Sequence, residues 1–379
     1  MCVGEGGWPT FHDVDLLIGT SAHAGGRCGT VVEAAEQGKV NVVRHLCELP
    51  QGEPEAVSPR AMDAALLSAA QNGHSNVVRH LCELPQGEHE AVSPWAMNKA
   101  LLSAAQNGHS NVVRHLCELS QGEREAVSPW ALNKALLSAA QNGYSNVVRH
   151  LCELSQGERE AVSRWALNQA MVSAAVKGHS TAVRYLCELP LDRGVKPSTN
   201  GNRAIRWAAH NGHIDVVRYL CELPLARGVD PAADNSSAIR RAASHNDVNV
   251  VRYLCELPLD RGVDPSATNN LAVLRAAETG SVDVLRYLCE LPLDRGVDPS
   301  AAANAAVRWA AHNGHMDVVR YLCELPRHRG VDPSAATNAA VQWAAHNGHM
   351  DVVRYLCELP LNRGVDPVRA VRFPHNMQA

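Results

Sequence analysis

Cysteine is the residue whose type and regular spacing could do chemistry in this chain. Twelve cysteines occur among 379 residues, and the interval between them is 35 residues from Cys47 to Cys187 and 34 residues from Cys187 to Cys357. A zinc site takes ligands only about two to four residues apart in one loop. A disulfide needs Cα atoms within about 7 Å, whereas neighbouring packed helices lie about 8–10 Å apart. We therefore predict small buried thiols rather than metal ligands or disulfides.

Histidine is the second candidate, because His-Asn-Gly-His recurs at residues 210–213, 312–315 and 346–349. Two histidines three residues apart could share a metal ion, but the His-Glu-x-x-His pattern is missing. The chain also has no phosphate-binding Gly-x-x-x-x-Gly-Lys loop, nucleophile elbow or cofactor motif. We predict no catalytic residues, no metal and no cofactor, so the protein is not expected to be an enzyme.

The elements that would position these residues are repeated helix pairs, because a fixed period in this range is typical of a solenoid. In the copy that contains Cys357, residues 338–348 form the expected first helix, with Asn338 as its cap and Gly348 at its end. Residues 351–359 form the expected second helix, with an apolar stripe at helical spacing. Pro360 ends it.

The central motif of each copy is Ala-Ala-x-x-Gly-His-x-x-Val-Val-x-x-Leu, as in residues 344–356. This motif resembles the ankyrin repeat. The resemblance implies an all-α, helical-hairpin solenoid of about ten repeats of 34–35 residues, over residues 30–365. It also implies that the second histidine of His-Asn-Gly-His braces backbone groups in the turn. Residues 1–29 are expected to be a Gly-rich tail or partial cap, and residues 366–379 a C-terminal tail.

The repeats depart from the ankyrin pattern in one place. Asn-x-Ala-Ile/Val-Arg-Trp, as in residues 202–207, replaces the usual Thr-Pro-Leu-His box, and Asn is expected to take over the Thr capping role. In the first half, Ser93-Pro94-Trp95 is itself a good helix start, with Ser as the cap and Pro in the first position. The β-hairpin fingers of ankyrins are therefore expected to be short or absent.

The position just before the Ala-Ala pair differs between the two halves of the chain. In ankyrins, the residue at this position tends to face the concave groove. In the first half it holds small or polar residues such as Ser138. In the second half it holds Trp and Arg, which are enriched at interface hot spots. A competing interpretation is that these tryptophans only pack between repeats. The predicted partner-binding residues are Trp207, Arg241, Arg275, Trp309 and Trp343.

Composition narrows the function. The net charge of -4 argues against a nucleic-acid or membrane-surface partner, and no apolar run reaches the roughly 18 residues of a membrane span. No secretory signal is recognisable, and twelve thiols favour a reducing compartment, the cytoplasm or the nucleus. The resemblance implies a non-catalytic protein–protein interaction scaffold, expected to be a monomeric array.

Two alternatives stay open. The spacing of Gly364 and Pro367 relative to Gly348 and Asp351 is also compatible with pentatricopeptide repeats, which bind single-stranded RNA. The other alternative is a substrate-recruiting adaptor of an enzyme complex such as a ubiquitin ligase.

Overall fold

The computed structural model describes residues 28–48, 57–84, 92–119, 127–154, 162–360 and 365, and these residues contain helices and no strand. They confirm the predicted all-α repeat of about ten helix pairs without β-hairpin fingers. The chain divides into two compact units, residues 1–135 and 136–379. The predicted tails, 1–29 and 366–379, lie outside the described residues except for Cys28 and Gly29, where α2 begins.

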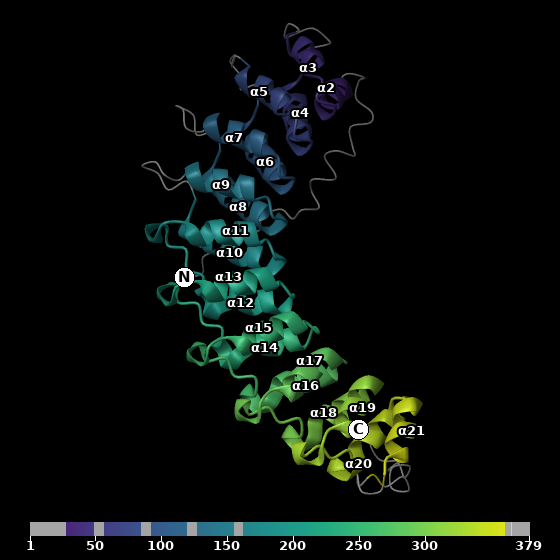
Figure 1. The fold of residues 1–379 in the computed structure, drawn as a ribbon. Helices are drawn as coiled ribbons and strands as arrows, with labels where there is room; N and C mark the ends of the chain where they lie inside the picture. Colours follow the sequence, from purple (N-terminus) through teal and green to yellow (C-terminus); the bar gives the residue numbers. More distant parts are fainter. Residues whose placement is uncertain are drawn as a thin grey trace, which may run out of the picture. The chain divides into compact units, whose positions relative to one another are not determined.

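Each repeat contributes a first helix, which carries an even number in Figure 1, and a second helix, which carries an odd number. The helices of the first unit are α2 (Cys28–Glu36), α3 (Val40–Cys47), α4 (Pro59–Gln71), α5 (Ser75–Glu83), α6 (Pro94–Gln106) and α7 (Ser110–Leu119). Helix α8 (Pro129–Asn142) spans the division. The second unit continues with α9 (Ser145–Glu153), α10 (Arg164–Lys177), α11 (Ser180–Glu188), α12 (Thr199–His210), α13 (Ile214–Glu222), α14 (Ala233–Ala243), α15 (Val248–Glu256), α16 (Ala267–Glu278), α17 (Val282–Glu290), α18 (Ala301–His312), α19 (Met316–Glu324), α20 (Ala335–His346) and α21 (Met350–Glu358).

Small side chains hold each unit together. First helices pack on first helices, as in α4 with α6 and α12 with α14, and second helices pack on second helices. The Ala-Ala pairs lie on the first helices and are buried, as at Ala208 and Ala209, except that Ala345 of the last pair is part-buried. The cysteines of the second helices are free, and seven of them, from Cys117 to Cys323, are buried. Burial raises the pKa of the Cys117 thiol to about 12, so the thiol stays protonated and packs as a small hydrophobic group.

The histidine of the Gly-His pair braces a backbone group, as predicted, and that group belongs to the preceding repeat. His315 Nε2 lies 2.9 Å from the carbonyl oxygen of Glu278. Its ring packs against Gly280, where a Cβ atom would lie 2.6 Å from the ring and the backbone φ is +74°. Only glycine combines that backbone conformation with so close a neighbour. The same bond to a backbone carbonyl of the preceding repeat is made by His74, His109, His179 and His213.

The first helices begin in two different ways. In the first half, Ser93 Oγ accepts a hydrogen bond from the backbone N–H of Ala96 at 3.1 Å, and Pro94 occupies the first helical position, as predicted. In the second half the helix follows a left-handed turn of three residues, such as Ala302, Ala303 and Asn304 with φ of 54°, 54° and 61°.

The predicted capping role of Asn is wrong for Asn202 and Asn304. Asn304 lies in the left-handed turn, and its side-chain oxygen accepts from the backbone N–H of Asp332 in the next repeat at 2.8 Å. The cap position, Ser300, makes no side-chain capping bond. We call the residue that makes the bond to the next repeat the clamp residue. In the second unit, clamp bonds to the next repeat come from Asn168, Asn202, Ser236, Asn270 and Asn304.

Candidate partner-binding surface

The five predicted residues occupy one equivalent position on five consecutive first helices of the second unit, α12 to α20. Trp309 and Arg275 are exposed, and the other three are half-buried. The competing interpretation, that the tryptophans only fill space between repeats, does not fit Trp309, which is 39% exposed. We call the five residues the Trp/Arg row.

Two successive repeats stack rings and a guanidinium at the start of the Trp/Arg row. The Arg241 guanidinium lies over the Trp207 ring, 4.8 Å from its centroid. The ring of His210 meets Trp207 edge-on at 4.9 Å and lies 3.9 Å from His245. Burial lowers the pKa of His210, and His245 and Arg241 lower it further. His210 is therefore a neutral aromatic neighbour of Arg241 at neutral pH.

A second cluster lies at the other end of the Trp/Arg row. Trp309 and Trp343 have ring centroids 5.6 Å apart, and His312 meets both rings edge-on. Arg308 lies over the Trp343 ring at 5.4 Å and also donates to the carbonyl oxygen of Ala302 in its own left-handed turn. The two tryptophans thus form an aromatic surface that is held from both sides.

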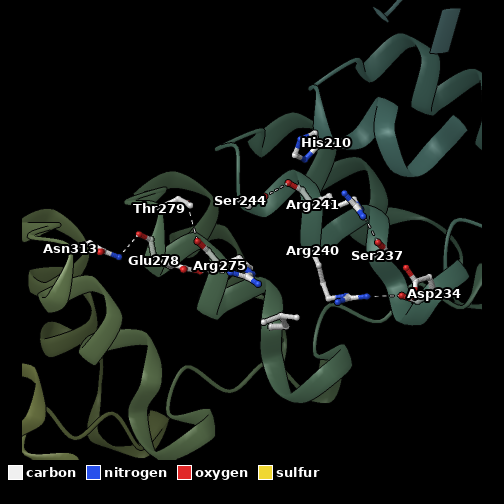
Figure 2. Close-up of a pocket in the computed structure, with 11 residues that line it drawn as sticks. His210, Asp234, Ser237, Arg240, Arg241, Ser244, Arg275, Glu278, Thr279 and Asn313 are labelled. Carbon is white, nitrogen blue, oxygen red and sulfur yellow. Dashed lines mark hydrogen bonds and ion pairs between the residues drawn. The ribbon is translucent and has the colours of Figure 1, made fainter. Parts of the chain in front are cut away.

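A hollow of about 740 Å³ lies between the clusters, on α14 and α16 (Figure 2). Arg241 donates through Nε to Ser237 Oγ at 3.1 Å. Arg275 pairs with Glu278 at 2.6 Å. Arg240 donates to the backbone carbonyl of Asp234 at 2.6 Å. Of these lining residues, sequence reasoning found Arg241 and Arg275 and missed the rest.

The sequence did contain a signal for part of the missed set. Arg precedes the Trp/Arg row in Asn-x-Ala-Ile/Val-Arg-Trp, and this Arg closes the left-handed turn. Arg206 donates to the carbonyl of Asn200, and it forms an ion pair of 2.6 Å with Asp234 of the next repeat. The recurrence of Arg directly before the Trp/Arg row therefore indicated an ion pair that supports this surface.

The arginines of the second helices lie on another face. Arg218 and Arg286 are exposed, and each lies over a tyrosine ring of the following repeat, at 5.1 Å from Tyr253 and 5.3 Å from Tyr321. This regular stacking links second helices within the unit. It gives these arginines a structural role.

Two further observations bear on chemistry. No three His, Cys, Asp or Glu side chains come together as possible metal ligands in the described ranges. Among those same residues, every helix is too short or too polar to cross a lipid bilayer.

Comparison with known proteins identifies the family. The family model described as ankyrin repeats (3 copies) matches residues 31–129, 66–163, 136–235 and 291–369. The chain belongs to the ankyrin repeat family, as the motif predicted. The X-ray structure of an ankyrin repeat family protein from Legionella pneumophila is similar, with 21% sequence identity, a TM-score of 0.35, and coverage of 84% of this chain and 89% of that chain. No curated protein matches.

Proposed function

We propose that this protein is a non-catalytic scaffold that binds a partner protein through the Trp/Arg row. The observation that carries the proposal is the repetition of Trp or Arg at one part-exposed position on the first helices of five consecutive repeats, from Trp207 to Trp343. Trp and Arg dominate the binding energy of protein interfaces. Ankyrin repeat proteins typically serve protein–protein interaction, and the family membership supports the same class of function.

The Trp/Arg row is also preorganised. Arg241 already stacks on Trp207, and Trp309 already lies against Trp343. Side chains held in this way lose little conformational entropy when a partner binds, so more of the contact energy remains as affinity. A row of unsupported long side chains would bind more weakly for the same contact area.

The partner and setting follow from charge and thiols. The net charge of -4 favours a protein over a nucleic acid as the partner. Ten free cysteines in the described ranges favour a reducing compartment, the cytoplasm or nucleus, where the protein would act as a monomeric array.

The experiment is an affinity capture under reducing conditions, with and without nuclease, that compares wild type with a Trp309→Ala/Trp343→Ala variant. The matched control is Trp95→Ala/Trp130→Ala, because these tryptophans are 51% and 57% exposed and lie outside the Trp/Arg row. We expect protein partners that survive nuclease, persist with the control, and weaken at least about 10-fold with the row variant.

Circular dichroism of each variant shows whether it folds. If the row variant folds and retains every partner, the Trp/Arg row is not the binding surface. If all captured material disappears with nuclease, the partner is a nucleic acid and the protein-scaffold proposal fails.

A further inference from the structure

Positive charge concentrates around the hollow between α14 and α16, although the whole chain is slightly acidic. Arg240, Arg241 and Arg275 line it, and Arg206 is paired with its Asp234. Four guanidinium groups thus face two carboxylates, those of Asp234 and Glu278. The excess of positive charge predicts attraction of an anionic group.

Arg241 lines the hollow without an ion pair of its own. Its Nε is bonded to Ser237 and its plane rests on Trp207, but no carboxylate of the described residues pairs with it. Burial lowers the pKa of Arg241, Arg206 and Arg240 lower it further, and Asp234 offsets only part of the shift. A charged group in this position gains more from an incoming anion than an exposed arginine would, because water screens it less.

The polar neighbours of Arg241 and Arg275 are largely occupied within the protein. Ser244 Oγ donates to the carbonyl of Arg241 at 2.7 Å, and Thr279 Oγ1 donates to the carbonyl of Arg275 at 2.9 Å. Glu278 neutralises only one side of Arg275, whose side chain is 48% exposed. The guanidinium groups are therefore the donors that remain for a ligand.

We propose that the hollow receives the carboxylate of an acidic side chain, Asp or Glu, from an extended segment of the partner protein, with Arg241 and Arg275 as donors. The inference rests on the proposed function and adds the chemistry of the ligand. A volume of about 740 Å³ is ample for one side chain and its backbone. The planar fork of Arg matches a carboxylate, and each such bond is shorter and stronger than a neutral one.

The repeat spacing also sets a register. Arg275 and Trp309 occupy equivalent positions on α16 and α18, and packed helices lie about 8–10 Å apart. A peptide in the extended polyproline II conformation advances about 3.1 Å per residue with three residues per turn, so side chains three positions apart lie on the same face. A residue about three positions from the acid would therefore reach Trp309, where an apolar or aromatic side chain packs best. The expected motif is an acidic residue followed or preceded, three positions away, by an apolar one.

The test uses a random dodecapeptide library displayed on phage and selected on the full chain. We expect the enriched peptides to share an acidic residue. Binding of a synthetic enriched peptide should weaken about 10-fold or more for Arg241→Gln and for Arg275→Gln. The matched control is Arg203→Gln, which removes an exposed arginine of α12 that does not line the hollow.

A double-mutant cycle identifies the contact. Replacing the acidic residue of the peptide with Gln or Asn should weaken its binding to wild type by the same factor of about 10. The same peptide change should weaken binding to the Arg275→Gln variant little further, because the contact is already lost. Arg275, being half exposed, keeps the test decisive if Arg241→Gln disturbs folding.

Two results would separate the proposals. Peptides that depend on Trp309 and Trp343 but carry no acid, or an acid uncoupled from both arginines, overturn this inference and leave the scaffold proposal standing. Selected peptides that ignore the Trp309→Ala/Trp343→Ala change overturn both.

Discussion

The repeats of residues 57–154 and those of residues 190–360 share their internal contacts and differ at their surface. Both bury an Ala-Ala pair, both brace a Gly turn with histidine, and both use a clamp residue. In front of the Ala-Ala pair, the first region has half-buried serines such as Ser68, and the second has Trp or Arg. The comparison teaches that the repeat scaffold tolerates a change of surface chemistry without a change of packing.

The clamp shows how one contact serves two local structures. In the first region, Asn98 Oδ1 accepts from the backbone N–H of Ser128, the residue before Pro129 of the next first helix. In the second region, Asn270 Oδ1 accepts from the backbone N–H of Asp298, which itself shapes the turn by accepting from the N–H of Ser300. The same side chain therefore positions a helix start in one region and a loop in the other.

Loss of the clamp should have the largest effect and tests whether the two regions share it. We expect Asn270→Ala and Asn98→Ala each to lower the free energy of unfolding by about 1–3 kcal/mol, because a part-buried N–H loses its acceptor. Asn270→Ser should retain most of the stability, since Ser236 is a natural clamp residue. Urea denaturation and hydrogen exchange measure the change. An effect in only one region would show that the clamp is not shared.

Glycine substitution should have opposite signs in the two regions. Ala303 has φ of 54°, a conformation that costs a non-glycine residue roughly 1–2 kcal/mol, and Gly201 occupies the equivalent place in the first such turn. Ala303→Gly should therefore stabilise the chain by up to about 1 kcal/mol. Ala64→Gly, in the regular helix α4, should destabilise it by about 1 kcal/mol. Thermal unfolding of the two variants would decide; destabilisation by both would argue against the left-handed turn.

Helix capping should matter in the first region alone. Ser93 Oγ accepts from the N–H of Ala96, so Ser93→Ala should cost about 1 kcal/mol. Ser300 makes no capping bond, and its hydroxyl donates to the exposed Asp298. Ser300→Ala should cost only a few tenths of that amount. Equal losses of stability in the two variants, measured by chemical denaturation, would contradict this difference.

The stacking of arginine on tyrosine should contribute a smaller amount in the second region. Arg218→Gln removes the cation over Tyr253 and should cost about 0.5–1 kcal/mol. Arg203→Gln removes an exposed arginine that does not line the hollow and serves as the control. A comparison of their denaturation midpoints checks the prediction. Indistinguishable midpoints would show that the stacking does not contribute to stability.

The smallest effect should be a pH dependence of the second helices that is confined to the first region. There, histidine replaces tyrosine beside the arginine, and burial lowers the pKa of His80 and His115, with Arg44 and Arg79 adding to the shift. The folded-state pKa then lies below the unfolded value near 6.5, so stability is complete above about pH 6.5 and decreases as the pH falls below it.

Hydrogen exchange in α5 and α7 at pH 7.5 and 5.5, compared with α17 and α19, measures this dependence. A His80→Tyr/His115→Tyr variant should lose it, because tyrosine stays neutral throughout that range. Equal acid sensitivity in wild type and variant would assign the effect to other groups.

Much of the fold could be predicted because its determinants repeat. Cysteines at 34- and 35-residue intervals, the Ala-Ala pair and Ser93-Pro94 are local signals, and the structure confirms the helices, the packing and the cap they indicated. The Trp/Arg row was found in the same way, as one column of the repeat. Its role in partner binding stays a prediction.

Local reasoning failed where a side chain bonds to another repeat. Asn304 has the chemistry of a helix cap, and nothing in its neighbourhood in the sequence indicates the N–H of Asp332 as its partner. The hollow was missed for the same reason, since Arg241 of α14 and Arg275 of α16 come to line one hollow only when the two helices lie side by side.

The sequence alone therefore determined the repeat, its helices and the residues that form the Trp/Arg row, because periodic burial needs only the order of small and large apolar residues. Only the tertiary structure decided which polar groups pair and where charge gathers. The energies of hydrogen bonds and ion pairs depend on contact distances of about 3–4 Å, and these distances exist only after neighbouring repeats have packed.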